Sequence, residues 1–123
     1  MKSCLIVDDS RVIRKVARQI FEALSFSCEE TEDGQKALDA CKAKMPDFVL
    51  LDWNMPVMNG LEYLLALRAL PQGGDPVVVF CTTENDLNHI QQALSSGANE
   101  YIMKPFDADI VRSKLAQLGV IDA

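Results

Sequence analysis

The chain has 123 residues, and 18 acidic against 12 basic side chains give it a formal net charge of −6 at pH 7. This length fits one domain of ordinary size, so we expect residues 1–123 to form a single domain with no output domain. Hydrophobic residues at 49% and charged residues at 24% exclude a disordered, collagen-like or coiled-coil chain.

Composition also limits the location and the partners of the protein. Apolar runs such as 48–51 and 77–81 are too short to cross a bilayer, and no basic-then-apolar leader opens the chain. A negative net charge is unsuited to binding the phosphate backbone of nucleic acids. We therefore expect a cytoplasmic protein, a monomer, that binds neither nucleic acid nor membrane.

The chain has four cysteines, at positions 4, 28, 41 and 81. No two of them have the Cys-x-x-Cys spacing, and no histidine lies near them in the sequence, which argues against a zinc site. A chain that can bury a real core has little need of a disulfide framework. We expect free structural thiols.

Short apolar runs alternate with amphipathic stretches along the chain. Residues 3–8 predict a strand, 10–24 a helix and 27–31 a weak strand; Asp33-Gly34 marks a turn before a helix over 37–45, which Pro46 ends. The next pairs of strand and helix are expected at 48–52 and 61–69, at 76–82 and 87–94, and at 100–103 and 107–118. Asn59-Gly60 predicts a turn with positive φ before the third helix.

The strands indicate how these elements pack. Their apolar runs are continuous rather than alternating, which is typical of strands buried on both faces. Strands that alternate with helices form a parallel sheet with right-handed crossovers. The predicted fold class is therefore α/β, a doubly wound five-stranded parallel sheet with helices on both faces.

Polar residues stand where four of the expected strands end. They are Asp8 and Asp9 after the first strand, Asp52 at the end of the third, Thr82 at the end of the fourth and Lys104 after the fifth. Each alone has an ordinary explanation, such as a helix cap or a solvated charge. In a doubly wound sheet, however, ligands bind at the carboxyl ends of the strands, so the five together indicate a site.

The residue types at this edge favour phosphoryl transfer. Carboxylates gathered in one place repel one another unless a cation relieves them, and Mg²⁺ prefers a few fixed oxygen ligands and a shared phosphate. A carboxylate can attack phosphorus, and Lys104 and Mg²⁺ would stabilise the equatorial oxygens of the phosphoryl group. The residues therefore predict a Mg²⁺-dependent aspartyl-phosphate site.

The chain resembles the receiver domains of bacterial two-component response regulators over essentially its whole length. The motifs that carry the resemblance are Leu5-Ile6-Val7-Asp8-Asp9-Ser10, Leu51-Asp52-Trp53-Asn54-Met55-Pro56, Cys81-Thr82-Thr83-Glu84 and Tyr101-Ile102-Met103-Lys104-Pro105-Phe106. The stretch 52–56 is most similar to the stand-alone chemotaxis members of the family. The resemblance implies the flavodoxin-like strand order 2-1-3-4-5.

The resemblance also implies a role for each residue of the site. Asp52 would be the phosphoacceptor, assisted by Lys104 and Thr82. Mg²⁺ would be bound by Asp9, Asp52 and the backbone carbonyl of Asn54 directly, and by Asp8 through water. Thr82 and Tyr101 would form the switch, and the peptide bond between Lys104 and Pro105 would be cis.

The function implied is that of a stand-alone response regulator with no enzymatic turnover beyond its own phosphorylation and dephosphorylation. A sensor histidine kinase or phosphotransfer protein would donate the phosphoryl group. The surface of the fourth helix, fifth strand and fifth helix would then bind a downstream protein, a flagellar motor switch protein if the output is chemotaxis. A phosphorelay intermediate and a phosphate sink share the same site chemistry.

Two other classes of protein fit these residues less well. Aspartyl-phosphate phosphatases typically carry a second Asp two residues after the nucleophile, where this chain has Asn54. A flavodoxin-like redox protein needs a loop that accepts phosphate after the first strand, where Asp8 and Asp9 would repel it.

Three further residues carry expectations. Thr83 stands where the family usually has Ala or Gly, and its bulk beside the site would slow entry of a small donor or of water, whereas Glu84 with Asn54 favours a short-lived phosphate. His89, the one histidine, is expected to be a solvated residue of the fourth helix.

Overall fold

Strands and helices alternate along the chain in the computed structural model, which describes residues 2–82 and 87–122. In order, the elements are β1 (Ser3–Val7), α1 (Arg11–Ala23), β2 (Ser27–Thr31), α2 (Gly34–Ala43), β3 (Phe48–Asp52), α3 (Gly60–Ala69), β4 (Val77–Thr82), α4 (Leu87–Ser95), β5 (Glu100–Met103) and α5 (Ala108–Gln117). Every predicted element is present, with ends that differ by a few residues. Thr83 and Glu84 lie outside the described residues.

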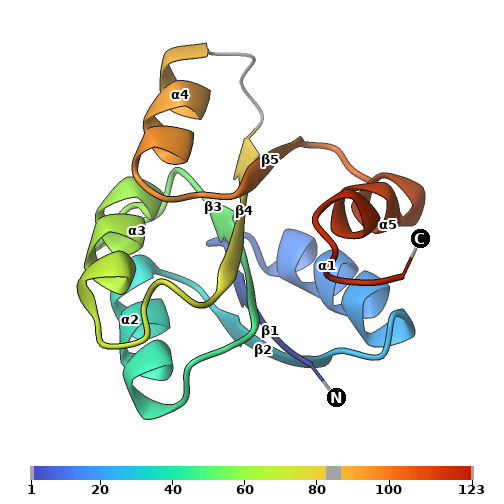
Figure 1. Ribbon diagram of the computed structural model, residues 1–123, viewed down its shortest axis with the longest axis horizontal. Coiled ribbons are helices and arrows are strands. Elements are labelled where there is room, and N and C mark those ends of the chain that lie inside the picture. The colour runs from blue at the N-terminus through green and yellow to red at the C-terminus, as the bar shows by residue number, and fades with distance from the viewer. Residues whose placement is uncertain (1, 83–86, 123) are drawn as a thin grey trace.

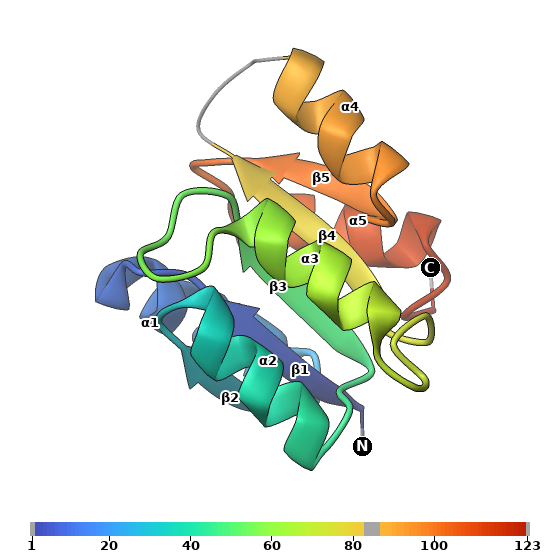
Figure 2. The same ribbon diagram turned by 90° about the vertical axis from the view of Figure 1, so that its left-hand side faces the viewer.

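The strands form one parallel sheet in the order β2-β1-β3-β4-β5, as predicted. Helices α1 and α5 cover one face of the sheet and α2, α3 and α4 the other (Figure 1). Figure 2 shows α2 and α3 in front of the sheet, with α1 and α5 behind it. The fold is therefore the doubly wound α/β class that the continuous apolar strands predicted.

Two layers of buried side chains hold the sheet between its helices. On the side of α2, α3 and α4 the core includes Leu51, Tyr63 and Phe80. On the side of α1 and α5 it includes Phe21 and Phe48, whose ring centroids are 5.2 Å apart. Strand β3 is buried at all five positions, because it lies in the middle of the sheet and is covered on both faces. Asp52, the last residue of this strand, thus stands at the end of a central, fully buried strand.

Polar residues cap the helices that follow the strands. Ser10 caps α1, Asp33 caps α2 and Asp107 caps α5, each through a side chain that accepts a backbone N–H of the first turn. Such caps satisfy donors that the helix itself leaves unpaired. After β1, β2 and β5 the chain enters the next helix within a few residues, which keeps these connections short.

The prediction of a positive-φ turn at Asn59-Gly60 is wrong. Asn59 has φ −75° and caps α3 in a reciprocal capping box with Glu62. Gly60 is required for another reason: a Cβ there would collide with the backbone carbonyl oxygen of Asp52. The positive φ in this loop falls on Val57 instead, at 67°. Sequence reasoning chose Asn-Gly because that pair suits left-handed backbone, but here the pair begins a helix packed tightly against β3.

Across the described residues, no helix has both the length and the apolar character needed to traverse a membrane.

Candidate functional site

The carboxyl ends of the parallel strands meet at one edge of the sheet. Asp8 and Asp9 directly follow β1, Asp52 is the last residue of β3, and Lys104 directly follows β5. The Lys104 Nζ donates to Asp8 Oδ2 at 2.7 Å and to Asp52 Oδ1 at 3.1 Å. Lys104 therefore reaches past β4 and pairs with both buried carboxylates at once.

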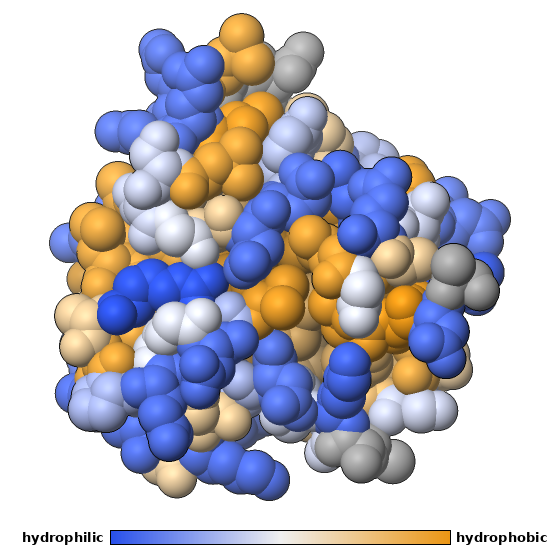
Figure 3. All heavy atoms as spheres, viewed as in Figure 1, coloured by the Kyte–Doolittle hydropathy of each residue, from blue (hydrophilic) through white to orange (hydrophobic). Residues whose placement is uncertain are grey.

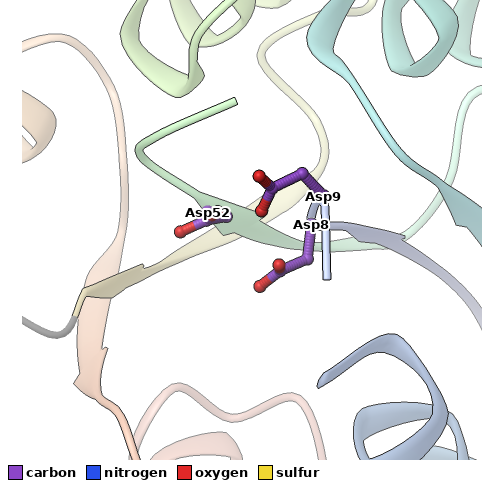
Figure 4. Close-up of side chains that lie close together, drawn as sticks. All are labelled: Asp8, Asp9 and Asp52. Atoms are coloured by element: carbon purple, nitrogen blue, oxygen red, sulfur yellow. The ribbon is translucent and has the colours of Figure 1, made fainter. Parts of the chain in front are cut away.

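Three carboxylates form a compact cluster next to this lysine. One oxygen from each of Asp8, Asp9 and Asp52 can be chosen so that all three lie within 4.8 Å of one another. Figure 4 shows Asp8 and Asp9 side by side after β1 and Asp52 beside them on β3. Asp8 and Asp52 are only 3% and 8% exposed, whereas Asp9 is exposed. The cluster is thus buried at its base and open at Asp9.

Backbone amides fix the orientation of the two buried carboxylates. The N–H of Ser10 donates to Asp8 Oδ1 and the N–H of Trp53 donates to Asp52 Oδ1, both at 2.9 Å. These bonds use one oxygen of each group. The other oxygen of Asp52 has no partner among the interactions found in the described residues, which leaves it available to a ligand or a phosphorus atom.

Burial dominates the electrostatics of the phosphoacceptor candidate. It raises the pKa of Asp52 to about 6, and the charge of Asp8 adds to this rise while Lys104 opposes it. Burial by itself would lower the pKa of Lys104, but the carboxylates of Asp8 and Asp52 outweigh that effect and raise it. With three carboxylates against one ammonium, the cluster has an excess of negative charge that a divalent cation would relieve.

The donor set fits a hard divalent cation. Carboxylate oxygens are the ligands that Mg²⁺ prefers, and a site that supplies only a few of them leaves room for water and a phosphate. Asp9 and Asp52 offer such oxygens, with Asp8 behind them. Asn54 is exposed in the loop after β3, two residues beyond Asp52.

Comparison with known proteins agrees with this geometry. The profile of the family described as response regulator receiver domain matches residues 4–116. The chain belongs to this family. It is 34% identical over 115 residues to the chemotaxis protein CheY of Pseudomonas aeruginosa, covering 93% of each chain, and 36% identical to CheY-3 of Vibrio cholerae, covering 93% of this chain and 88% of the relative.

Solved structures of receiver domains have the same fold. The chemotaxis response regulator CheY4 of Vibrio cholerae superposes with a TM-score of 0.90 at 30% identity, over 96% of this chain and 98% of that one. The receiver domain of sensor histidine kinase PA1611 from Pseudomonas aeruginosa, described with a magnesium ion coordinated in the active site cleft, superposes with a TM-score of 0.86 at 23% identity, over 94% and 95% of the chains.

The two residues expected to form the switch of this receiver domain lie on neighbouring strands. Thr82 is buried at the end of β4, and its carbonyl accepts the N–H of Lys104 at 2.8 Å. Tyr101 is half-buried on β5, where it pairs in register with Phe80, two residues before Thr82. Thr82 and Phe80 therefore share a face of the sheet. The peptide bond between Lys104 and Pro105 is cis.

Sequence reasoning missed one contact of this site. His89 was expected to be a solvated helix residue, and this is wrong: it is half-buried, and its ring stacks on Trp53 with centroids 4.7 Å apart and planes 24° from parallel. Phe80 meets the same indole edge-on at 5.0 Å. The one signal in the sequence for this contact was the Trp at position 53, because a large aromatic side chain beside a strand end packs favourably against other rings.

Proposed function

We propose that this receiver domain is a stand-alone response regulator that accepts a phosphoryl group on Asp52 in a Mg²⁺-dependent reaction. The observation that carries the proposal is the position of Lys104, which donates to both Asp8 and Asp52 at the buried base of a three-carboxylate cluster. A lysine in this position would form an ion pair with the oxygens of a phosphoryl group on Asp52. The donor would be a phosphohistidine on a sensor kinase or phosphotransfer protein.

In the transfer, a carboxylate oxygen of Asp52 forms a bond to phosphorus as the bond from phosphorus to the histidine nitrogen breaks. Asp52 must be ionised for this attack, and Lys104 favours that form. Lys104 is also placed to hold charge on the equatorial oxygens, while the buried Thr82 hydroxyl would donate to one of them. Mg²⁺, held by Asp9, Asp52 and the carbonyl of Asn54, with Asp8 contributing through water, would neutralise the remaining charge.

The product would act as a switch and not as an intermediate of enzymatic turnover. A phosphoryl group adds about −1.5 to −2 charge and three strong acceptors at Asp52. Movement of Thr82 toward it would free space for Tyr101, and so change the surface formed by α4, β5 and α5. Asn54, where phosphatases of the aspartyl-phosphate class have a second Asp, supports a protein without turnover of a separate substrate.

The surface of α4, β5 and α5 suits a protein target. Helix α4 carries no charged side chain between Leu87 and Ser95, and exposes Leu87 at 68% and Leu94 at 40%. Figure 3 shows hydrophilic and hydrophobic side chains side by side on this helix. The similarity to CheY proteins supports a chemotaxis output through a flagellar motor switch protein. A phosphorelay intermediate or phosphate sink is the alternative.

The direct test follows the fluorescence of Trp53, the one tryptophan in the chain, during titration with Mg²⁺ and then with an acyl phosphate donor. We expect a change with Mg²⁺ and a second change with the donor, together with a phosphate adduct by intact mass. Asp52→Asn should abolish the adduct, and Asp75→Asn, an exposed Asp outside the site, should not. An adduct that persists in Asp52→Asn would refute the assignment.

A further inference from the structure

Two of the four cysteines lie side by side near the amino-terminal ends of their strands, whereas Asp52 lies at the carboxyl end of β3. Cys4 of β1 and Cys28 of β2 are register partners in the parallel ladder. Register partners on neighbouring strands point to the same face, and such strands are about 4.8 Å apart. That spacing falls within the roughly 4.4–6.8 Å between Cα atoms that disulfides span.

The two thiols differ in access. Cys4 is 1% exposed within the core on the side of α1, whereas Cys28 is half-buried at the rim of that core. Cys28 belongs to β2, which pairs with β1 alone and is an edge of the sheet. An edge strand can make the small shift that bond formation between neighbouring strands requires. Small molecules in solvent can therefore reach the Cys28 thiol, whereas the Cys4 thiol is buried next to it.

The surroundings of Cys28 favour its reactive form. The neighbouring Cys4 thiol lowers the pKa of Cys28, and the charge of Arg18 adds to this, whereas burial and the charges of Glu22 and Glu30 oppose it. The Cys28 thiol donates to the backbone carbonyl of Phe26 at 3.9 Å. Arg18 is held at this place because its Nη2 donates to the backbone carbonyl of Cys28 at 3.1 Å. Burial and the neighbouring Cys28 raise the pKa of Cys4, which stays a thiol. Thiolate character and access are what make a cysteine nucleophilic.

We propose that Cys4 and Cys28 form an oxidant-sensitive dithiol that hydrogen peroxide converts to an intramolecular disulfide. The Cys28 thiolate attacks one peroxide oxygen, the O–O bond breaks, and hydroxide leaves, so that Cys28 becomes a sulfenic acid. The sulfur of Cys4 then attacks the sulfur of Cys28, the S–O bond breaks, and the departing hydroxide takes the Cys4 proton as water. Two thiols and one peroxide thus give one disulfide and two waters.

Neither remaining cysteine shares this arrangement. Cys41 lies on α2 with its Sγ 3.1 Å from the hydroxyl of Tyr63, and burial raises its pKa. Cys81 lies on β4, is 1% exposed, and burial raises its pKa as well. The disulfide would close the β1-α1-β2 unit covalently, because α1 is the segment between the two cysteines.

The test counts thiols before and after oxidation of the full chain. Reduced protein is treated with increasing concentrations of hydrogen peroxide, denatured and alkylated. Its intact mass is then measured by mass spectrometry, and its peptides are mapped. We expect the number of alkylated cysteines to fall from four to two, with the peptides of Cys4 and Cys28 linked and no intermolecular dimer, and dithiothreitol to restore all four. The matched control, Cys41→Ala, should lose the same two thiols.

A second variant separates the two steps of the reaction. Cys4→Ala removes the resolving thiol, so Cys28 should accumulate as a sulfenic acid that dimedone traps, and Cys28→Ser should give neither the trap nor the disulfide. Circular dichroism verifies that each variant folds. The proposal is overturned if all four thiols survive peroxide that oxidises free cysteine, if another pair is linked, or if dimedone labels Cys28 no more than Cys41.

Discussion

His89 of α4 stacks face to face on Trp53, the residue that directly follows Asp52 on the chain. The contact connects a helix of the proposed signalling surface with the end of the strand that carries the proposed phosphoacceptor. It lies on the same side of the sheet as Phe80, which meets Trp53 edge-on and pairs in register with Tyr101. These ring contacts join the end of β3 to α4 separately from the proposed movement of Thr82 and Tyr101.

The stack makes Trp53 a reporter of the position of α4. In His89→Ala we expect the Trp53 emission to shift to longer wavelength, because the indole loses its cover, and the free energy of unfolding to fall by about 0.5–1.5 kcal/mol. Steady-state fluorescence and urea denaturation measure the two effects. Gln91→Ala, an exposed change on the same helix, should alter neither. An unchanged emission spectrum in His89→Ala would mean that the stack does not persist in solution.

Replacing Asp52 by Asn should stabilise the metal-free protein at neutral pH. The pKa of Asp52 is raised from 3.8 to about 6 in the folded state, so the folded protein binds more protons than the unfolded chain between these values. Ionisation of Asp52 therefore costs stability as the pH rises through 3.8 to 6, by up to about 3 kcal/mol once the pH exceeds 6. In Asp52→Asn this cost is removed, and loss of the charged hydrogen bond to Lys104 offsets part of the resulting gain in stability.

Urea denaturation of wild type and Asp52→Asn at pH 4 and pH 7.5 checks the sign. The advantage of the variant should be present at pH 7.5 and nearly absent at pH 4, where Asp52 is protonated in the folded protein. Asp75→Asn, in which an exposed carboxylate is removed, should show no such difference between the two pH values. If Asp52→Asn is less stable than wild type at pH 7.5, the ionised Asp52 carboxylate does not destabilise the folded protein.

Added Mg²⁺ should stabilise the wild type, because a ligand that binds the folded state alone shifts the unfolding equilibrium. At a hundred times the dissociation constant the gain is about 2.7 kcal/mol. Asp9→Asn should remove most of it, since Asp9 is the exposed member of the carboxylate cluster. Thermal denaturation with MgCl₂, against NaCl of equal ionic strength, measures the effect. Equal stabilisation of both proteins would place the ion elsewhere.

Val57 stores backbone strain in the loop after β3. It has φ 67°, in a region that β-branched residues rarely adopt, and its side chain is 81% exposed, so no packing compensates. Val57→Gly should raise the free energy of unfolding by about 1 kcal/mol and Val57→Asn by somewhat less. Val57→Ala removes the branch but keeps a Cβ and should gain less than either. Denaturation curves that rank Ala above Gly would contradict the left-handed conformation.

The order of strands and helices could be predicted because strand burial and helix periodicity are local properties of the sequence. The edge at which Asp8, Asp52 and Lys104 meet could also be predicted, since parallel strands share an end. Contacts that depend on how a helix is rotated could not. His89 looked solvated because nothing within α4 shows that Trp53 lies beneath it, and Asn59-Gly60 looked like a turn because the close approach of Gly60 to Asp52 is a tertiary constraint.

The ion pair between Lys104 and Asp8 joins residues 96 positions apart in the chain. During synthesis, the carboxylates of β1 and β3 leave the ribosome long before the lysine that must sit between them. Under the proposed phosphotransfer, a chain without β5 would lack the ammonium that Asp8 and Asp52 share. The ability to accept a phosphoryl group would thereby depend on completion of the sheet.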